Sequence, residues 1–73
     1  MDRTAVDSSV LRSVGYDPRA RVLELEFTGG RVYRYAGVPP RVHRELLAAE
    51  SHGRYFVRSV RGRYAYAAVP AGR

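Results

Sequence analysis

Arginine and tyrosine side chains gather near the carboxyl end of the sequence, where together they could bind a polyanion. The members of this cluster are Arg54, Tyr55, Arg58, Arg61, Arg63 and Tyr64. No Asp or Glu follows Glu50, so this segment is the most strongly basic part of the chain. Guanidinium groups can follow a phosphate backbone, and tyrosine rings can stack on unpaired bases. The pattern predicts a nucleic-acid-binding surface. The alternative, a solvated face or arginines packed over tyrosine rings, needs no ligand.

The net charge favours an acidic partner, but the type of basic residue is less informative. The formal net charge is +6, and all 13 basic residues are Arg. Lys, Ile and Asn are absent, which is typical of a GC-rich genome because their codons are AT-rich. Arg would then fill surface positions that Lys occupies elsewhere. Two classes of partner stay open: RNA or another nucleic acid, and an acidic protein.

Side chains for catalysis or metal binding are scarce. The chain has no Cys, which excludes disulfides, thiolate zinc sites and cysteine nucleophiles. His43 and His52 lack a second ligand at metal-binding spacing, and the Ser8-Ser9 pair is more typical of a turn or a local cap. No phosphate loop, nucleophile elbow or pair of catalytic carboxylates is present. We therefore predict that the protein is not an enzyme and has no metal and no cofactor.

Alternation of apolar and polar residues predicts the strands. In residues 22–27, leucines and a phenylalanine alternate with glutamates, which places one face in the core and the other in solvent. Residues 10–16 are rich in β-branched and aromatic side chains and predict a preceding strand, joined to the next through a turn at 17–20. Residues 31–36 predict a third strand, so the first three strands form a meander.

The loop between the second and third strands decides which side chains share a face. A two-residue loop would turn Arg34 toward the leucines. A three-residue loop, with Gly30 in a left-handed conformation, turns Tyr33 and Tyr35 toward the leucines instead and brings Arg34 close to Glu24. Because this register buries apolar groups and pairs opposite charges, we predict it. Tyr33 and Tyr35 are then core residues rather than stacking platforms for bases.

An amphipathic helix is predicted for residues 40–50, where apolar side chains recur at i, i+4 and i+7. Gly53 is expected to end this helix as a left-handed cap. Residues 54–63 fit a short helix or a strand, and we favour the helix; residues 64–69 predict a last strand. The expected fold class is α+β: a small antiparallel sheet, made of the meander and the short C-terminal strand, covered by one main helix and a short second helix.

These elements make a single small domain. The 73-residue chain is expected to fold at 7–69, between a flexible N-terminus at 1–6 and a flexible C-terminus at 70–73. No stretch approaches the roughly 20 apolar residues of a membrane span, and the first residues lack a signal-peptide core. We therefore expect a cytoplasmic protein without membrane association, and its oligomeric state stays open.

The order and spacing of several residues resemble a known family. They are Ser8-Ser9, Gly15-Tyr16-Asp17, Phe27 with Gly30, Tyr33-Arg34-Tyr35, Val38-Pro39, Ser51-His52-Gly53-Arg54-Tyr55-Phe56, and Arg61 with Tyr64. This set is similar to the KTSC domain, which is named for its occurrence at the C-terminus of some lysyl-tRNA synthetases and also occurs alone in bacteria. Val57 departs from the Asn that often follows the Tyr-Phe pair, and His43 departs from a common aromatic.

The resemblance implies an RNA-related role through the synthetase context, and it implies no catalytic residue. The motif residues expected to be structural are Gly30, Tyr33, Tyr35, Pro39, Gly53 and Phe56. We predict a small basic non-catalytic accessory module that binds RNA or another nucleic acid through its Arg/Tyr surface. The alternative is a protein-interaction module with no nucleic-acid role. An exposed aromatic among the last arginines would favour the first function, and an unpaired edge strand would favour the second.

Overall fold

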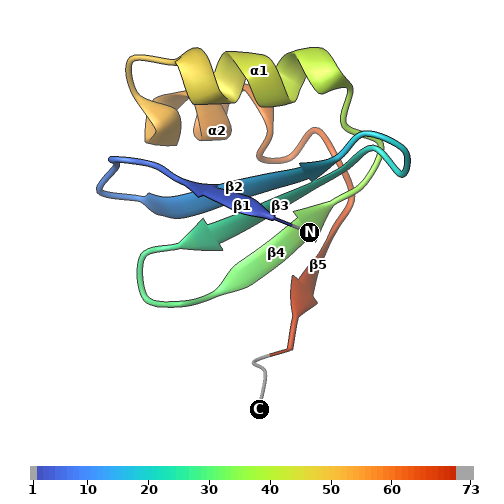
Figure 1. The fold of residues 1–73 in the computed structure, drawn as a ribbon, viewed down its shortest axis with the longest axis horizontal. Coiled ribbons are helices and arrows are strands. Elements are labelled where there is room, and N and C mark those ends of the chain that lie inside the picture. The colour runs from blue at the N-terminus through green and yellow to red at the C-terminus, as the bar shows by residue number, and fades with distance from the viewer. Residues whose placement is uncertain (1, 71–73) are drawn as a thin grey trace.

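The structure, a computed structural model that describes residues 2–70, is an antiparallel sheet with two helices on one face (Figure 1). The sheet has five strands in the order β1-β2-β3-β4-β5, so every strand pairs with its neighbour in sequence. This confirms the predicted α+β fold. The elements are β1 (Arg3–Ala5), β2 (Leu11–Asp17), β3 (Val22–Phe27), β4 (Val32–Tyr35), α1 (Pro40–Ala48), α2 (His52–Ser59) and β5 (Tyr66–Val69).

The first strand, β1, was not predicted. It lies antiparallel to β2, with Arg3 opposite Gly15 and Thr4 opposite Val14. All three of its residues are exposed, so it carries no alternating apolar pattern that a sequence could show. The structure thus corrects the strand count, and it places a strand within residues 1–6, which were expected to be a flexible end. The expected flexible C-terminus at 70–73 lies outside the described residues apart from Pro70.

The hairpin of β3 and β4 has the predicted register. Tyr33 lies opposite Leu25, and Arg34 lies opposite Glu24. The three-residue loop is therefore confirmed. Its two glycines, Gly29 and Gly30, both have a positive φ, +103° and +93°. The positive φ of Gly30 was predicted, and that of Gly29 was not. Side chains at either position would be strained, because L-residues rarely adopt this region.

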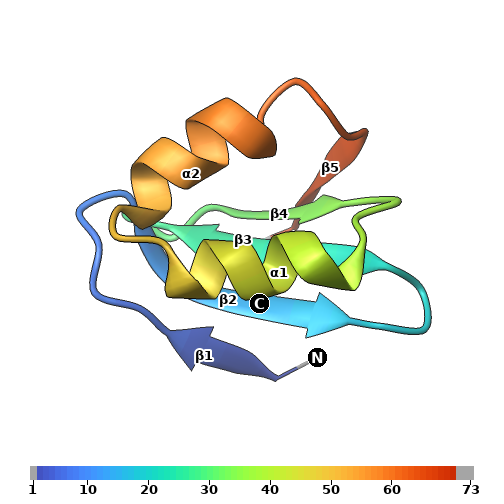
Figure 2. The same cartoon turned by 90° about the horizontal axis from the view of Figure 1, so that it is seen from above.

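The core lies between the helical layer and the sheet. Leu23 and Leu25 of β3 are fully buried, as are Leu46 of α1 and Val60 just after α2. Figure 2 shows α1 lying over β2 and β3, with α2 beside it on the side of β4. The opposite face of the sheet carries no helix in residues 2–70 (Figure 1). Burial of one face against helices explains why the apolar side chains of β3 occur at every second position.

The two helices are shorter than predicted, and the second begins two residues earlier. The helix α1 begins at Pro40, preceded by Pro39 in extended conformation, and ends at Ala48, where Ala49 is extended. Gly53 does not cap α1: it lies in the first turn of α2, and its φ is not positive. The short helix favoured for 54–63 is confirmed, with bounds His52–Ser59. Its N-cap is Ser51, whose hydroxyl accepts a hydrogen bond from the Arg54 N–H at 3.2 Å.

Gly53 is instead required by a close approach between α2 and the loop before β2. A Cβ on this residue would lie 2.9 Å from Cγ2 of Val10 and 3.3 Å from its Cβ. Alanine normally stabilises a helix over glycine by about 1 kcal/mol. We expect the opposite sign for Gly53→Ala, a loss of about 1–2 kcal/mol in the free energy of unfolding by urea denaturation. In a Val10→Ala background the same change should become neutral or stabilising, and a stabilised single variant would contradict the contact.

Candidate functional site

The outward side of α2 and of the turn after it is basic. Tyr55, Phe56 and Val60 face the core, so the positions between them at helical spacing face solvent. Four exposed arginines occupy this side and the following turn, and we call them the arginine surface: Arg54, Arg58, Arg61 and Arg63. Every arginine of the predicted cluster is therefore exposed, Arg54 and Arg58 on α2 and Arg61 and Arg63 in the turn after it.

The charges of the arginine surface are not neutralised by carboxylates. Among residues 2–70, salt bridges involve Arg3 and Arg34 with Glu24, and Arg41 with Glu45, and none includes the arginine surface. The one side-chain hydrogen bond recorded within it runs from Nε of Arg63 to the backbone oxygen of Arg58, at 3.0 Å. The four guanidinium groups therefore remain able to bind an anion from solution.

Tyr55 does not belong to this surface. Only 7% of it is exposed, and its hydroxyl donates a hydrogen bond to Oε1 of Glu45 on α1 at 2.7 Å. Burial, followed by the hydrogen bond and charge of Glu45, raises the pKa of Tyr55. The guanidinium carbon of Arg58 lies 6.0 Å from the ring centroid. Tyr55 was predicted as a candidate for nucleic-acid binding; in the structure its hydroxyl joins α2 to α1 and its ring is covered, so we leave it out of the arginine surface.

The two tyrosines after α2 differ in exposure. Tyr64 is half-buried against the core, whereas Tyr66 on β5 is 64% exposed. Tyr66 is therefore the exposed aromatic that accompanies the last arginines.

The motif tyrosines of β4 face the helices, as predicted from the register. Tyr35 is buried and meets the ring of Phe56 edge-on at 5.8 Å, and Tyr33 meets Phe27 edge-on at 5.7 Å. Burial raises the pKa of Tyr35, and the hydroxyls of Tyr66 and Tyr33 raise it further, while the nearby charge of Arg61 lowers it. The tyrosine hydroxyls and the Arg61 guanidinium therefore lie in one neighbourhood.

A hollow of about 340 Å³ opens at this neighbourhood, and we call it the aromatic pocket. It is lined by Phe27, Arg31, Tyr33, Tyr35, Phe56, Arg61, Gly62 and Tyr66. Arg31 is not among the site residues predicted from the sequence. Period-two alternation along β4 was the available signal, because it places residue 31 on the same face as residues 33 and 35. The pocket joins the arginine surface through Arg61, which belongs to both.

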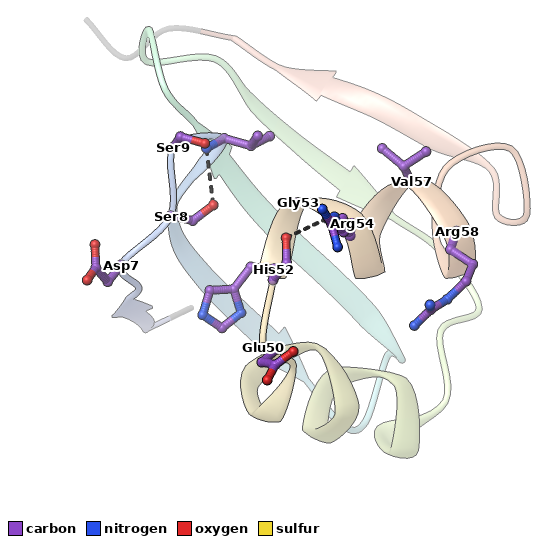
Figure 3. A pocket seen from close by; sticks show the side chains of 11 residues that line it. Asp7, Ser8, Ser9, Glu50, His52, Gly53, Arg54, Val57 and Arg58 are labelled. Carbon is purple, nitrogen blue, oxygen red and sulfur yellow. Dashed lines mark hydrogen bonds between the residues drawn. The ribbon is translucent and has the colours of Figure 1, made fainter.

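A second groove runs along the first half of α2 (Figure 3). Ser8 and Ser9 form one wall, and His52, Arg54 and Arg58 lie on the other. Its polar groups are engaged locally: the Ser8 hydroxyl accepts hydrogen bonds from the backbone N–H groups of residues 10 and 11, at 3.1 and 3.3 Å. Ser8 is thus a local cap, as its sequence context indicated. Carboxylates of residues 7 and 50 also line this groove, so an anion bound there would meet negative charge as well as Arg54 and Arg58 of the arginine surface.

The histidines serve the fold. His43 stacks on Tyr16 with ring centroids 4.9 Å apart, and burial, followed by the charge of Arg44, lowers the pKa of His43. The ring Nδ1 of His52 lies 2.8 Å from the backbone oxygen of Leu46. Within residues 2–70, no three side chains of the His, Cys, Asp or Glu type come close enough together to hold a metal ion. In the same range, neither helix has the length and apolar character needed to cross a membrane.

The fold and surface together define a small α+β module with a basic, aromatic end and two helices on one sheet face. The chain belongs to the KTSC domain family, whose model matches residues 7–64. The family resemblance of the sequence is thereby confirmed. A crystal structure of a KTSC domain protein from Yersinia pestis superposes with a TM-score of 0.90 at 38% identity, covering 94% of this chain and 97% of that one.

Sequence relatives occur both as short proteins and within a much longer one. A protein of Stutzerimonas stutzeri, described as uncharacterized, is 55% identical over 56 residues, which cover 77% of this chain and 79% of the relative. A lysine–tRNA ligase of Nostoc sp. is 37% identical over 60 residues, which cover 82% of this chain but 11% of the ligase. The family domain is therefore found in chains of very different length.

Proposed function

We propose that this chain is a non-catalytic module that binds single-stranded RNA in the cytoplasm through the arginine surface. One observation carries the proposal: α2 and the turn after it carry four exposed arginines without carboxylate partners in residues 2–70, and one of them, Arg61, lines a pocket with the exposed Tyr66. Phosphate contacts supply affinity that does not depend on sequence, and aromatic rings accept unpaired bases. The similarity to part of a ligase whose name contains tRNA agrees with this role.

The spacing of arginines along α2 supports a localised site over diffuse attraction. Elsewhere, arginines such as Arg3 and Arg34 have a glutamate partner, so their charge is partly cancelled. On the arginine surface the charges add, because Arg54 and Arg58 follow each other by one helical turn. An RNA strand lying along α2 would meet successive guanidinium groups.

The salt dependence of RNA binding tests the proposal. If about three phosphates are contacted, log K should fall with log salt with a slope of roughly −2 for a single strand. Arg58→Ala with Arg61→Ala should flatten the slope by about 0.7 for each lost contact and weaken binding with little dependence on base sequence. Fluorescence anisotropy of a labelled oligouridine at several salt concentrations measures both quantities.

The matched control removes the same charge elsewhere. Arg12 and Arg19 are exposed and form no ion pair with a carboxylate among residues 2–70, so Arg12→Ala with Arg19→Ala leaves other contacts intact. A localised site requires this pair to keep the parental slope. Equal loss in both double variants would mean diffuse attraction, and absence of binding at about 100 mM salt would remove the RNA role.

A protein-interaction role is the second candidate, and the edge of the sheet favours it. The strand β5 pairs with β4 on one side only, which leaves one row of its backbone groups free for a strand from another protein. Only Tyr66–Val69 are available there, which limits the hydrogen bonds that such a partner could add. An acidic extended segment would suit the nearby arginines.

A further inference from the structure

Five aromatic side chains from four elements form a closed circuit of contacts around the aromatic pocket. In order, the ring centroids are separated by 5.7 Å for Phe27–Tyr33, 5.7 Å for Tyr33–Tyr66, 5.5 Å for Tyr66–Tyr35, 5.8 Å for Tyr35–Phe56 and 5.1 Å for Phe56–Phe27. Four of these contacts are edge-on and one is tilted. In an edge-on pair the edge of one ring meets one face of the other, so each contact covers a single face. Tyr66 is 64% exposed, so part of its ring remains free to stack on a planar guest.

The pocket is accessible from solvent. Tyr66 closes the circuit from the edge strand while remaining 64% exposed. The Tyr35 hydroxyl makes no hydrogen bond within residues 2–70, yet no buried polar side-chain atom in that range lacks a partner. This oxygen must therefore reach solvent, through a hollow such as the one it lines. A volume of about 340 Å³ lies at the low end of small-ligand sites and suits one heteroaromatic ring better than a folded partner.

The charge of the pocket selects the kind of guest. Arg31 and Arg61 line it, and no acidic residue is among its lining residues. An aromatic cage without arginines would attract a cation, but two guanidinium groups repel one and attract an anion. Neither arginine lies over a ring of the pocket: among residues 2–70, the one cation–π contact joins Arg58 to the ring of Tyr55. The ring faces are thus not occupied by the protein's own cations.

We propose that the aromatic pocket takes one unpaired base of single-stranded RNA, with an adjoining phosphate on Arg61 or Arg31. A nucleotide combines the two features that this lining favours, a planar ring and a neighbouring negative charge. Tyrosine hydroxyls can donate to or accept from the edge of the base. Because Arg61 also belongs to the arginine surface, the strand would run along α2 and turn one base inward, between the β4–β5 strand pair and the turn after α2. This inference rests on the proposed RNA-binding function.

Tyr66 provides the test, since it is the most exposed member of the circuit. We expect Tyr66→Ala to weaken binding of an oligouridine of about ten nucleotides by roughly five- to 100-fold, the loss of one stacked base. The salt slope should stay parental, because no phosphate contact is removed. Tyr66→Phe keeps the ring and should bind like the parent. Val57→Ala, on the outward side of α2 but outside the pocket, should also leave binding unchanged.

A second test changes the ligand and leaves the protein unaltered. It uses an abasic oligomer, which has the ribose-phosphate backbone of oligouridine but no bases. The parent should bind it roughly five- to 100-fold more weakly than oligouridine, and Tyr66→Ala should then cause no further loss. The proposal that the pocket binds a base would be overturned if the parent bound the two oligomers with equal affinity. It would also be overturned if Tyr66→Ala bound oligouridine like the parent. If Arg58→Ala with Arg61→Ala still weakens binding in that case, the proposed function stands without it. A parent that binds neither oligomer overturns both.

Discussion

Phe56→Ala is expected to lower the free energy of unfolding by about 3–5 kcal/mol. Phe56 is 7% exposed and joins α2 to the sheet through edge-on contacts with Phe27 at 5.1 Å and Tyr35 at 5.8 Å. Removing the ring leaves a cavity and takes away two aromatic pairs. Domains are stable by roughly 0.05–0.15 kcal/mol per residue, so the loss would consume much of the stability of a chain of 73 residues.

The neighbouring residue supplies the control for this prediction. Val57 follows Phe56 on α2 but is 55% exposed, so Val57→Ala should change the free energy of unfolding by no more than about 0.5 kcal/mol. Urea denaturation followed by circular dichroism and tyrosine fluorescence measures both variants. A loss below about 1 kcal/mol for Phe56→Ala would mean that α2 does not pack on the sheet through this ring.

Arg34→Met is expected to cost about 2–3 kcal/mol, although Arg34 is itself largely exposed. Its Nε donates to Oε1 of Glu24 at 2.7 Å, while NH1 of Arg3 lies 3.3 Å from Oε2 of the same carboxylate. Glu24 is only 6% exposed on the face without helices. Without Arg34 the covered carboxylate loses its shortest hydrogen bond and keeps only the longer contact with Arg3, and a buried charge that loses a partner is costly. Glu24→Gln should cost less, because both guanidinium groups still reach water.

An exposed ion pair on α1 serves as the comparison for Arg34. Arg41 and Glu45 lie 3.8 Å apart on α1 and both are largely in solvent. Arg41→Met should therefore change the free energy of unfolding by about 0.5 kcal/mol or less. Chemical denaturation of the two arginine variants in the same buffer gives the answer. Similar losses for Arg34→Met and Arg41→Met would show that the burial of Glu24 does not make its ion pair more stabilising than an exposed one.

Local patterns were sufficient for the central hairpin and for α1. Only one register of β3 and β4 places Tyr33 and Tyr35 beside leucines and Arg34 beside Glu24, so burial and charge agreed on the loop length. Apolar spacing in residues 40–50 likewise predicted α1 to within two residues at its end. In both cases the residues that decide the conformation are neighbours in the sequence.

Partners distant in sequence decided the features that were missed. The strand β1 has only exposed residues and forms because β2 offers it a free row of hydrogen-bonding groups. Gly53 was assigned to a cap because glycine signals a helix end, yet the side chain of Val10 is what excludes a larger residue there. Tyr55 was placed on the surface, but Glu45 of α1 holds its hydroxyl inside. No local pattern contains these contacts.

The same distinction between local patterns and distant contacts applies to the candidate site. The sequence determined the charge of the arginine cluster and, through alternation, that Phe27, Tyr33 and Tyr35 share one face. It could not show that Phe56 from α2 and Tyr66 from β5 complete a circuit with them, because those contacts exist only once α2 and β5 pack beside β4. The aromatic pocket is therefore a product of tertiary packing: separate elements bring together rings that no spacing in the sequence connects.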